Sequence, residues 1–154
     1  MLTTVTVLVL LTTILLFTRK GSERQVQIIK EKAALIGAIY RARSLATNTV
    51  QQAKEDCGFG VQILSETTYV IWYDTAELVG CGDSNQRYDG PWENIDEPRQ
   101  FGVGLTFGNY GDQNMLKSIL FIPPDPRIVL QPEATSGGQW KIELADSSGN
   151  AATI

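Results

Sequence analysis

The sequence predicts an α+β fold, in which one long N-terminal α-helix packs against a mostly antiparallel β-sheet head. Residues 1–53 contain no proline, and they combine an uncharged start with later apolar residues at helical spacing. From residue 57 on, short β-branched and aromatic runs alternate with glycine, proline, aspartate and asparagine. Because 154 residues suffice for one domain and an appendage, we expect one helix half at 1–20 and a head at 21–154, which includes the amphipathic helix half at 22–54.

The first helix half begins with residues 1–17, which carry no charge and are apolar apart from five threonines. In a helix, threonine hydroxyls can donate to the carbonyl one turn earlier. The segment would cover about 26 Å, slightly less than the ~30 Å hydrocarbon core of a bilayer. A cleaved secretory signal would instead have a basic region before the apolar stretch and a small-residue site after it, and neither is present. The side chains that we expect to face membrane lipid or the core of a filament are Leu2, Val5, Val7, Leu8, Val9, Leu10, Leu11, Ile14, Leu15, Leu16 and Phe17.

The second helix half is amphipathic. Its apolar and small residues form one stripe, and most charged residues, Glu31 among them, are expected elsewhere around the helix. The stripe changes from isoleucine and leucine to alanine, which would let a sheet approach the helix closely. We expect the stripe to pack on the sheet, with a partner-binding groove as the alternative; its members are Ile28, Leu35, Ile39, Ala42 and Ala46.

The head is expected to begin with a β-hairpin, residues 59–65 and 68–74, because two β-branched and aromatic runs flank a two-residue connection. The unbroken apolar run 70–73 predicts a central strand covered on both faces. Further strands are expected at 100–107, 116–122, 127–131 and 139–145, with another beginning at 151–154. Residues 123–126 contain three prolines and should end the strand before them.

Cys57 and Cys81 are the two cysteines of the chain, and the hairpin between them could bring them together. A disulfide there would stabilise the head by ~3 kcal/mol and would persist outside the reducing cytosol. The alternatives are buried free thiols or a zinc site, but zinc would lack histidine and a paired C-x-x-C spacing.

The polar segment 80–99 has no clear period and is expected to be the most variable surface. Its start imitates a calcium loop, but Arg87 and Tyr88 replace an oxygen ligand and the required glycine. Asp89, Glu93, Asp96 and Glu97 could still form an irregular calcium site, and the alternative is a solvated acidic face. We expect neither a metal nor a cofactor.

Composition argues against most enzyme and nucleic-acid functions. The chain has no histidine, which removes the commonest general base and metal ligand. Its net charge of -4 would repel nucleic-acid phosphates. We therefore predict no catalytic residues and no nucleic-acid partner.

Three features in this order resemble the type IV pilin-like proteins, and within them the minor pilins and H-type pseudopilins of secretion systems. They are the apolar start running into an amphipathic helix with residues 43–46 (RSLA), then residues 57–61 (CGFGV), then residues 119–126 (ILFIPPDP). The resemblance implies a structural subunit of a type IV pilus or a type II secretion-like filament, assembled through the apolar helix. It would be a single-pass membrane protein before assembly and part of an extracellular or periplasmic filament afterwards.

The resemblance also implies partners, namely other pilin subunits, the inner-membrane assembly machinery, a prepilin peptidase and the membrane. Family members are made with a basic leader ending in glycine, and a glutamate follows shortly after the cut. Because Met1-Leu2 is similar to the dipeptide after that glutamate, we expect leader and glutamate upstream of Met1. The alternatives are a DNA-receptor or adhesive pilin, and a membrane-anchored binding module that does not polymerise.

Overall fold

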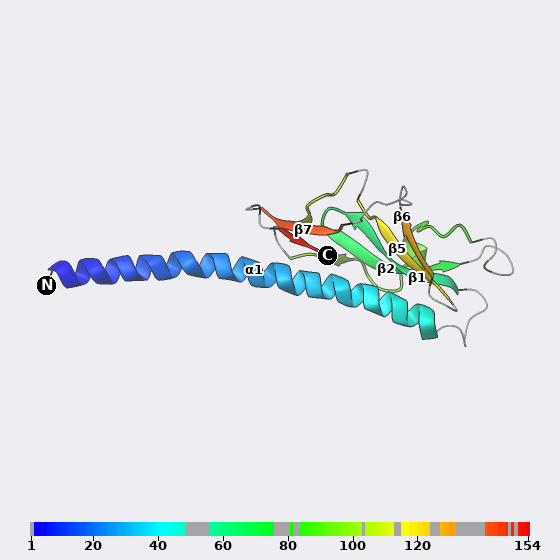
Figure 1. The fold of residues 1–154 in the computed structure, drawn as a ribbon, viewed down its shortest axis with the longest axis horizontal. Coiled ribbons are helices and arrows are strands. Elements are labelled where there is room, and N and C mark those ends of the chain that lie inside the picture. Colours follow the sequence, from blue (N-terminus) through cyan, green and yellow to red (C-terminus); the bar gives the residue numbers. More distant parts are fainter. Residues whose placement is uncertain are drawn as a thin grey trace.

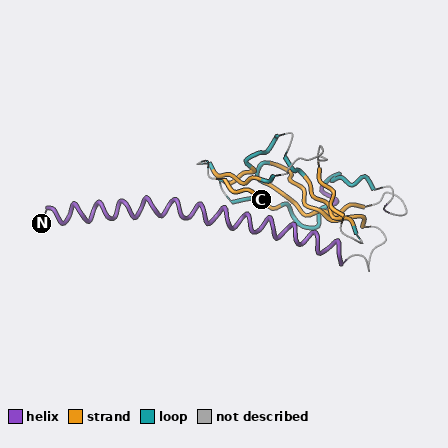
Figure 2. Tube along the Cα trace, in the orientation of Figure 1, coloured by secondary structure: helices purple, strands orange, loops and turns teal. Residues whose placement is uncertain are grey.

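The computed structural model describes residues 2–48, 56–75, 81, 84–102, 104–112, 115–123, 127–131, 141–147, 149 and 151–154, with the backbone alone at 2, 14–22 and 56. It is an α+β protein, with one long N-terminal helix packed against two antiparallel sheets (Figure 1). The C-terminal half of the helix runs along the head, and the N-terminal half extends beyond it (Figure 2).

Helix α1 spans Leu2–Asn48 and contains 47 residues. At 1.5 Å per residue it is about 70 Å long, several times the usual ~11-residue helix of globular proteins. The two predicted helix halves therefore form one continuous helix. The end expected at residue 54 falls in the stretch 49–55, outside the described residues.

The larger sheet has five strands in the order β3-β2-β1-β5-β6, and all neighbouring pairs are antiparallel. The smaller sheet has three strands in the order β4-β7-β8, also antiparallel. The strands are β1 (Asp56–Ser65), β2 (Thr68–Thr75), β3 (Arg99–Gln100), β4 (Leu105–Phe107), β5 (Ser118–Ile122), β6 (Arg127–Gln131), β7 (Glu143–Asp146) and β8 (Ala151–Thr153).

The predicted hairpin is confirmed, since β1 and β2 pair directly across residues 66–67. The strands predicted at 127–131 and near 151–154 are present, and β5 ends at Ile122, directly before the first proline of the predicted corner. Strand β7 begins at Glu143, while residues 139–140 of the predicted strand lie outside the described residues.

Two strand predictions are wrong. The segment 100–107 is not one strand, because the chain turns at Gly104, where φ is +84°, and joins β3 and β4 in different sheets. The middle strand of the larger sheet is β1 and not β2. In the sheet, β2 lies between β1 and the two-residue edge strand β3. The apolar run in β2 is nevertheless buried on both faces, as expected.

The core lies between α1 and the sheets. Phe59, Val61 and Ile63 alternate along β1 and pack in the same cluster as the helix stripe. Residues 84–88 lie against the other face of the large sheet, where Ser84 donates to Asp74. The Trp72 and Tyr88 rings meet there edge to face, with centroids 5.8 Å apart. Asn94 forms an isolated antiparallel bridge with Trp72 beside β2.

Candidate functional site

The apolar half of α1 is the most unusual surface of the molecule. Every side chain that the structure describes from residue 3 to residue 13 is exposed. Six large apolar side chains in this segment have exposed fractions between 53% and 63%; they are Val5, Val7, Leu8, Val9, Leu10 and Leu11. The remaining predicted residues, Leu2, Ile14, Leu15, Leu16 and Phe17, lie on α1, but their side chains are outside the description.

These six residues surround the helix instead of forming one stripe. Five of them occupy consecutive positions, and successive residues of an α-helix are about 100° apart. An α-helix that is apolar on all sides is normally buried, either in a protein core or in lipid. Within the described part of the chain, no helix meets both the length and the apolarity that crossing a membrane requires.

The threonines of this segment do not make it polar. Thr6 donates to the carbonyl of Thr3 at 2.9 Å, and Thr12 donates to that of Leu8 at 3.0 Å. Thr13 donates to the carbonyl of Val9 at 2.5 Å. Because these hydroxyls donate within their own helix, they need no partner from water or from another chain.

The second half of α1 buries a stripe in the head. Ile28, Leu35, Ala42 and Ala46 have exposed fractions of 5% or less, and Ile39 is half-buried against the same core. The stripe therefore packs within the chain.

Polar contacts beside this stripe also join the helix to the head. The sequence pattern did not predict these contacts. Arg41 donates to both carboxylate oxygens of Asp96, at 2.5 and 3.3 Å. The Lys32 ammonium donates to the carbonyl of Thr153 at 2.6 Å.

The prediction that Glu31 lies away from the stripe is wrong. Glu31 is 7% exposed, and its carboxylate lies 3.4 Å from the Arg99 guanidinium. Its spacing of three residues from Ile28 and four from Leu35 is the signal that could have revealed this, because such positions share one helix face. Asp96 lies on the irregular segment before β3, and Arg99 begins that two-residue strand, so no periodicity could reveal their partners.

The head carries a disulfide between Cys57 and Cys81, with the two Cα atoms 5.1 Å apart. It joins β1 to the segment that follows β2. Residues 84–94 are therefore covalently anchored close to their start. This segment includes a 3-10 turn, Pro91–Glu93, so the predicted irregular surface contains local structure.

Two buried carboxylates organise this segment, Asp74 from strand β2 and Glu93 from within the segment itself, and we call them the carboxylate clamp. Asp74 is 1% exposed and accepts a hydrogen bond from the Ser84 hydroxyl. Glu93 is 3% exposed and accepts one from the backbone N–H of Asp89 at 2.6 Å. Burial raises the pKa of both carboxyl groups, and repulsion from Asp89 raises it further, while these hydrogen bonds oppose the rise.

The four acidic residues considered for calcium do not form a common site. Glu93 is bonded to the backbone of Asp89, and Asp96 is paired with Arg41 on the helix. Among the described residues, no group of three or more aspartate, glutamate or cysteine side chains is placed to hold a metal ion.

No family model, no curated protein and no solved structure matches the chain. The likeness to pilin-like proteins therefore stays a prediction from the sequence. The function must be inferred from the exposed N-terminal half of α1 and from the head that packs along the C-terminal half.

Proposed function

We propose that this chain is a structural subunit, a minor pilin or pseudopilin, of a type IV pilus or type II secretion-like filament. The observation that carries the proposal is the all-round apolar surface of residues 3–13, which are exposed on α1 beyond the head. Helices that are apolar on every side can contact several neighbours at once. A bundle of such helices, with the heads outside, is therefore the assembly that suits them.

Exposure of the apolar half to water would be costly. Complete burial of one valine or leucine contributes about 1.5 to 3 kcal/mol, and the six described side chains are between 53% and 63% exposed, so covering them would contribute roughly 5 to 11 kcal/mol. Both lipid and a bundle of similar helices would provide this cover, and between the two the choice depends on how closely the helices pack. Contact with one neighbour would cover only one side of the helix.

The head supports the proposal in two ways. It lies alongside the C-terminal half of α1 only, which leaves the apolar half free of its own head (Figure 1). Its disulfide is typical of proteins outside the reducing cytosol. In this proposal the subunit is held in the membrane by the apolar half, is processed by a prepilin peptidase, and is extracted by an inner-membrane assembly machinery into a filament with other pilin subunits.

The test is recruitment into filaments sheared from the surface of the organism that makes the chain, or from a secretion system that it serves. Leu8→Asp should lower the amount of subunit in the filament fraction at least tenfold, because an unpaired carboxylate would be buried among apolar helices. The matched control is Ile128→Asp, which places the same charge at a 57% exposed residue of the head, against 62% for Leu8. Equal recruitment of Leu8→Asp and the wild type, at equal total amounts, would contradict the proposal.

A second candidate is an anchored binding module that does not polymerise. It is favoured by Trp92, which is 69% exposed on the 3-10 turn next to the buried Glu93. A large aromatic side chain held in one place at the surface is typical of contact sites. In that case the chain would stay entirely in the membrane fraction after shearing. Trp92→Ala would weaken binding of the module's ligand without altering the location of the chain.

A further inference from the structure

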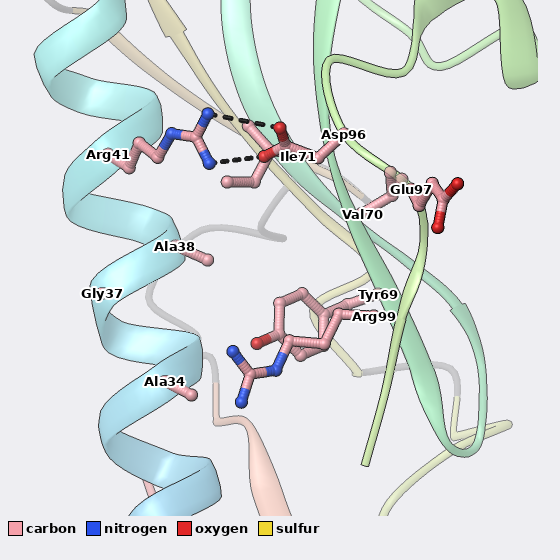
Figure 3. A pocket seen from close by; sticks show the side chains of 10 residues that line it. All are labelled: Ala34, Gly37, Ala38, Arg41, Tyr69, Val70, Ile71, Asp96, Glu97 and Arg99. Atoms are coloured by element: carbon pink, nitrogen blue, oxygen red, sulfur yellow. Dashed lines mark hydrogen bonds and ion pairs between the residues drawn. The ribbon is translucent and has the colours of Figure 1, made fainter.

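A pocket of about 340 Å³ lies between helix α1 and strand β2 (Figure 3). One wall is the helix at Ala34, Gly37 and Ala38, where two methyl groups and a glycine leave space. A Cβ added at Gly37 would meet no atom within 4 Å. The opposite wall is β2 at Tyr69, Val70 and Ile71, all of which are buried. Its volume falls within the ~300 to 1,000 Å³ range of small-molecule sites.

Two hydrogen-bond donors extend from the sheet side of the pocket toward the helix wall, the Tyr69 hydroxyl and the Arg99 guanidinium (Figure 3). Tyr69 is 2% exposed, and its hydroxyl has no hydrogen-bond partner among the described residues. A buried polar group without a partner destabilises the fold, so a ligand that accepts its hydrogen bond would remove that cost. Burial raises the pKa of Tyr69, so the phenol remains protonated and can donate at neutral pH.

Arg99 is the cation available to a ligand. Its one ion pair among the described residues is with Glu31 and is 3.4 Å long, beyond the ~2.7 to 2.9 Å of charge-assisted hydrogen bonds. Arg41, by contrast, is occupied by both oxygens of Asp96 and closes one end of the pocket. The Glu97 carboxylate points away from the pocket (Figure 3).

We propose that this pocket binds a small organic carboxylate, held by Arg99 and Tyr69, with its apolar stem against Ala34, Gly37 and Ala38. A carboxylate accepts hydrogen bonds only, which suits two donors, and its planar pair of oxygens suits a guanidinium. The Arg99 side chain is 50% exposed, and Arg99 is the cross-strand neighbour of Tyr69, so its guanidinium can turn toward an anion that enters beside Tyr69. This site belongs to the head and does not depend on filament assembly.

Glu31 gives the proposal a specific signature. Its carboxylate competes for the same guanidinium and repels an anion. Glu31→Gln should therefore tighten binding of a carboxylate, by about three- to tenfold. A neutral ligand would gain no comparable advantage, because it is not repelled by Glu31.

The experiment uses the full chain in detergent micelles, labelled with ¹⁵N. Sodium propionate is titrated against matched sodium chloride while the Arg99 Nε–H and Gly37 amide resonances are followed. We expect saturable shifts with propionate and at least tenfold weaker binding of propionamide. Arg99→Gln should weaken binding by about ten- to a hundredfold, and Tyr69→Phe, which keeps the ring against Phe101, by about three- to tenfold.

Arg127→Gln is the matched control, because it removes an exposed arginine from β6 and should leave binding unchanged. Absence of saturable shifts overturns the proposal, as does equal binding of propionamide or equal behaviour of Arg99→Gln and Arg127→Gln. A dilution series without propionate identifies the source of the carboxylate. Shifts at the Gly37 amide that grow with protein concentration and vanish in Arg99→Gln would show that an acidic side chain of a second copy occupies the pocket, whereas binding of propionate alone indicates a small molecule.

Discussion

The two halves of helix α1 differ in where their apolar side chains lie. Leu8 is 62% exposed in the first half, whereas Leu35 is fully buried in the second. The first half is apolar on every side, and the second carries one stripe beside charged residues. A stripe is sufficient for one partner, which here is the head of the same chain. An all-round apolar surface requires several partners, and the described head supplies none of them.

The largest expected effect is on the stability of the head, and it should differ between substitutions in the two halves of α1. Leu35→Ala should lower the free energy of unfolding of the head by about 2 to 5 kcal/mol, because it removes buried methyl groups and leaves a cavity. Leu8→Ala should change it by less than about 0.5 kcal/mol, because that side chain packs on nothing in the head. Denaturant unfolding of the full chain in micelles, followed by tryptophan fluorescence, measures both. Similar losses for the two variants would remove the distinction between the halves.

The disulfide should affect only the half of the molecule that contains the head. Cys57 and Cys81 are 24 positions apart, so the double variant Cys57→Ser with Cys81→Ser should lower head stability by about 3 kcal/mol. The helical signal of α1 residues 2–20 should persist at denaturant concentrations that unfold this variant's head. Circular dichroism beside tryptophan fluorescence compares the two regions. Loss of both signals in one transition would mean that the helix half depends on the head.

The carboxylate clamp should make head stability depend on pH. The pKa of Asp74 and of Glu93 is raised on folding, so the folded head binds more protons between their unfolded values, about 3.9 and 4.3, and the raised folded values. Their contribution is therefore fully present below the unfolded values and is lost as pH rises through the folded ones. Relative to the wild type, Asp74→Asn should lose part of this dependence, and Asp112→Asn, which alters an exposed carboxyl outside the clamp, should not. Identical profiles for both variants would contradict the clamp.

The smallest effect should come from the polar contact at the junction of helix and head. Arg41 and Asp96 are 54% and 42% exposed, so Arg41→Ala should lower head stability by only about 0.2 to 1 kcal/mol. A double-mutant cycle with Asp96→Ala isolates the interaction. A coupling energy above about 2 kcal/mol would show that this ion pair is as important as the stripe in joining the helix to the head.

The sequence was informative where structure depends on nearby residues. The hairpin of β1 and β2 and the stripe of α1 follow from periods of two and of about 3.6 residues. The split of 100–107 between two sheets and the position of β2 next to the edge depend on which distant strands pair, and no local period records that. The pairing of Arg99 with Glu31 and of Arg41 with Asp96, and the unpartnered hydroxyl of Tyr69, arise only when separate segments meet.

The contact of Lys32 with the Thr153 carbonyl has a consequence for how copies of the chain can join. Strand β8 is an edge of the smaller sheet, and edge strands can recruit strands from other molecules, which leads to aggregation. A lysine bonded to a carbonyl of that strand occupies an acceptor and brings a positive charge to the edge. This edge of the head is thereby less open to β-pairing with another head, and copies that assemble as proposed above would join through their helices and not through this edge.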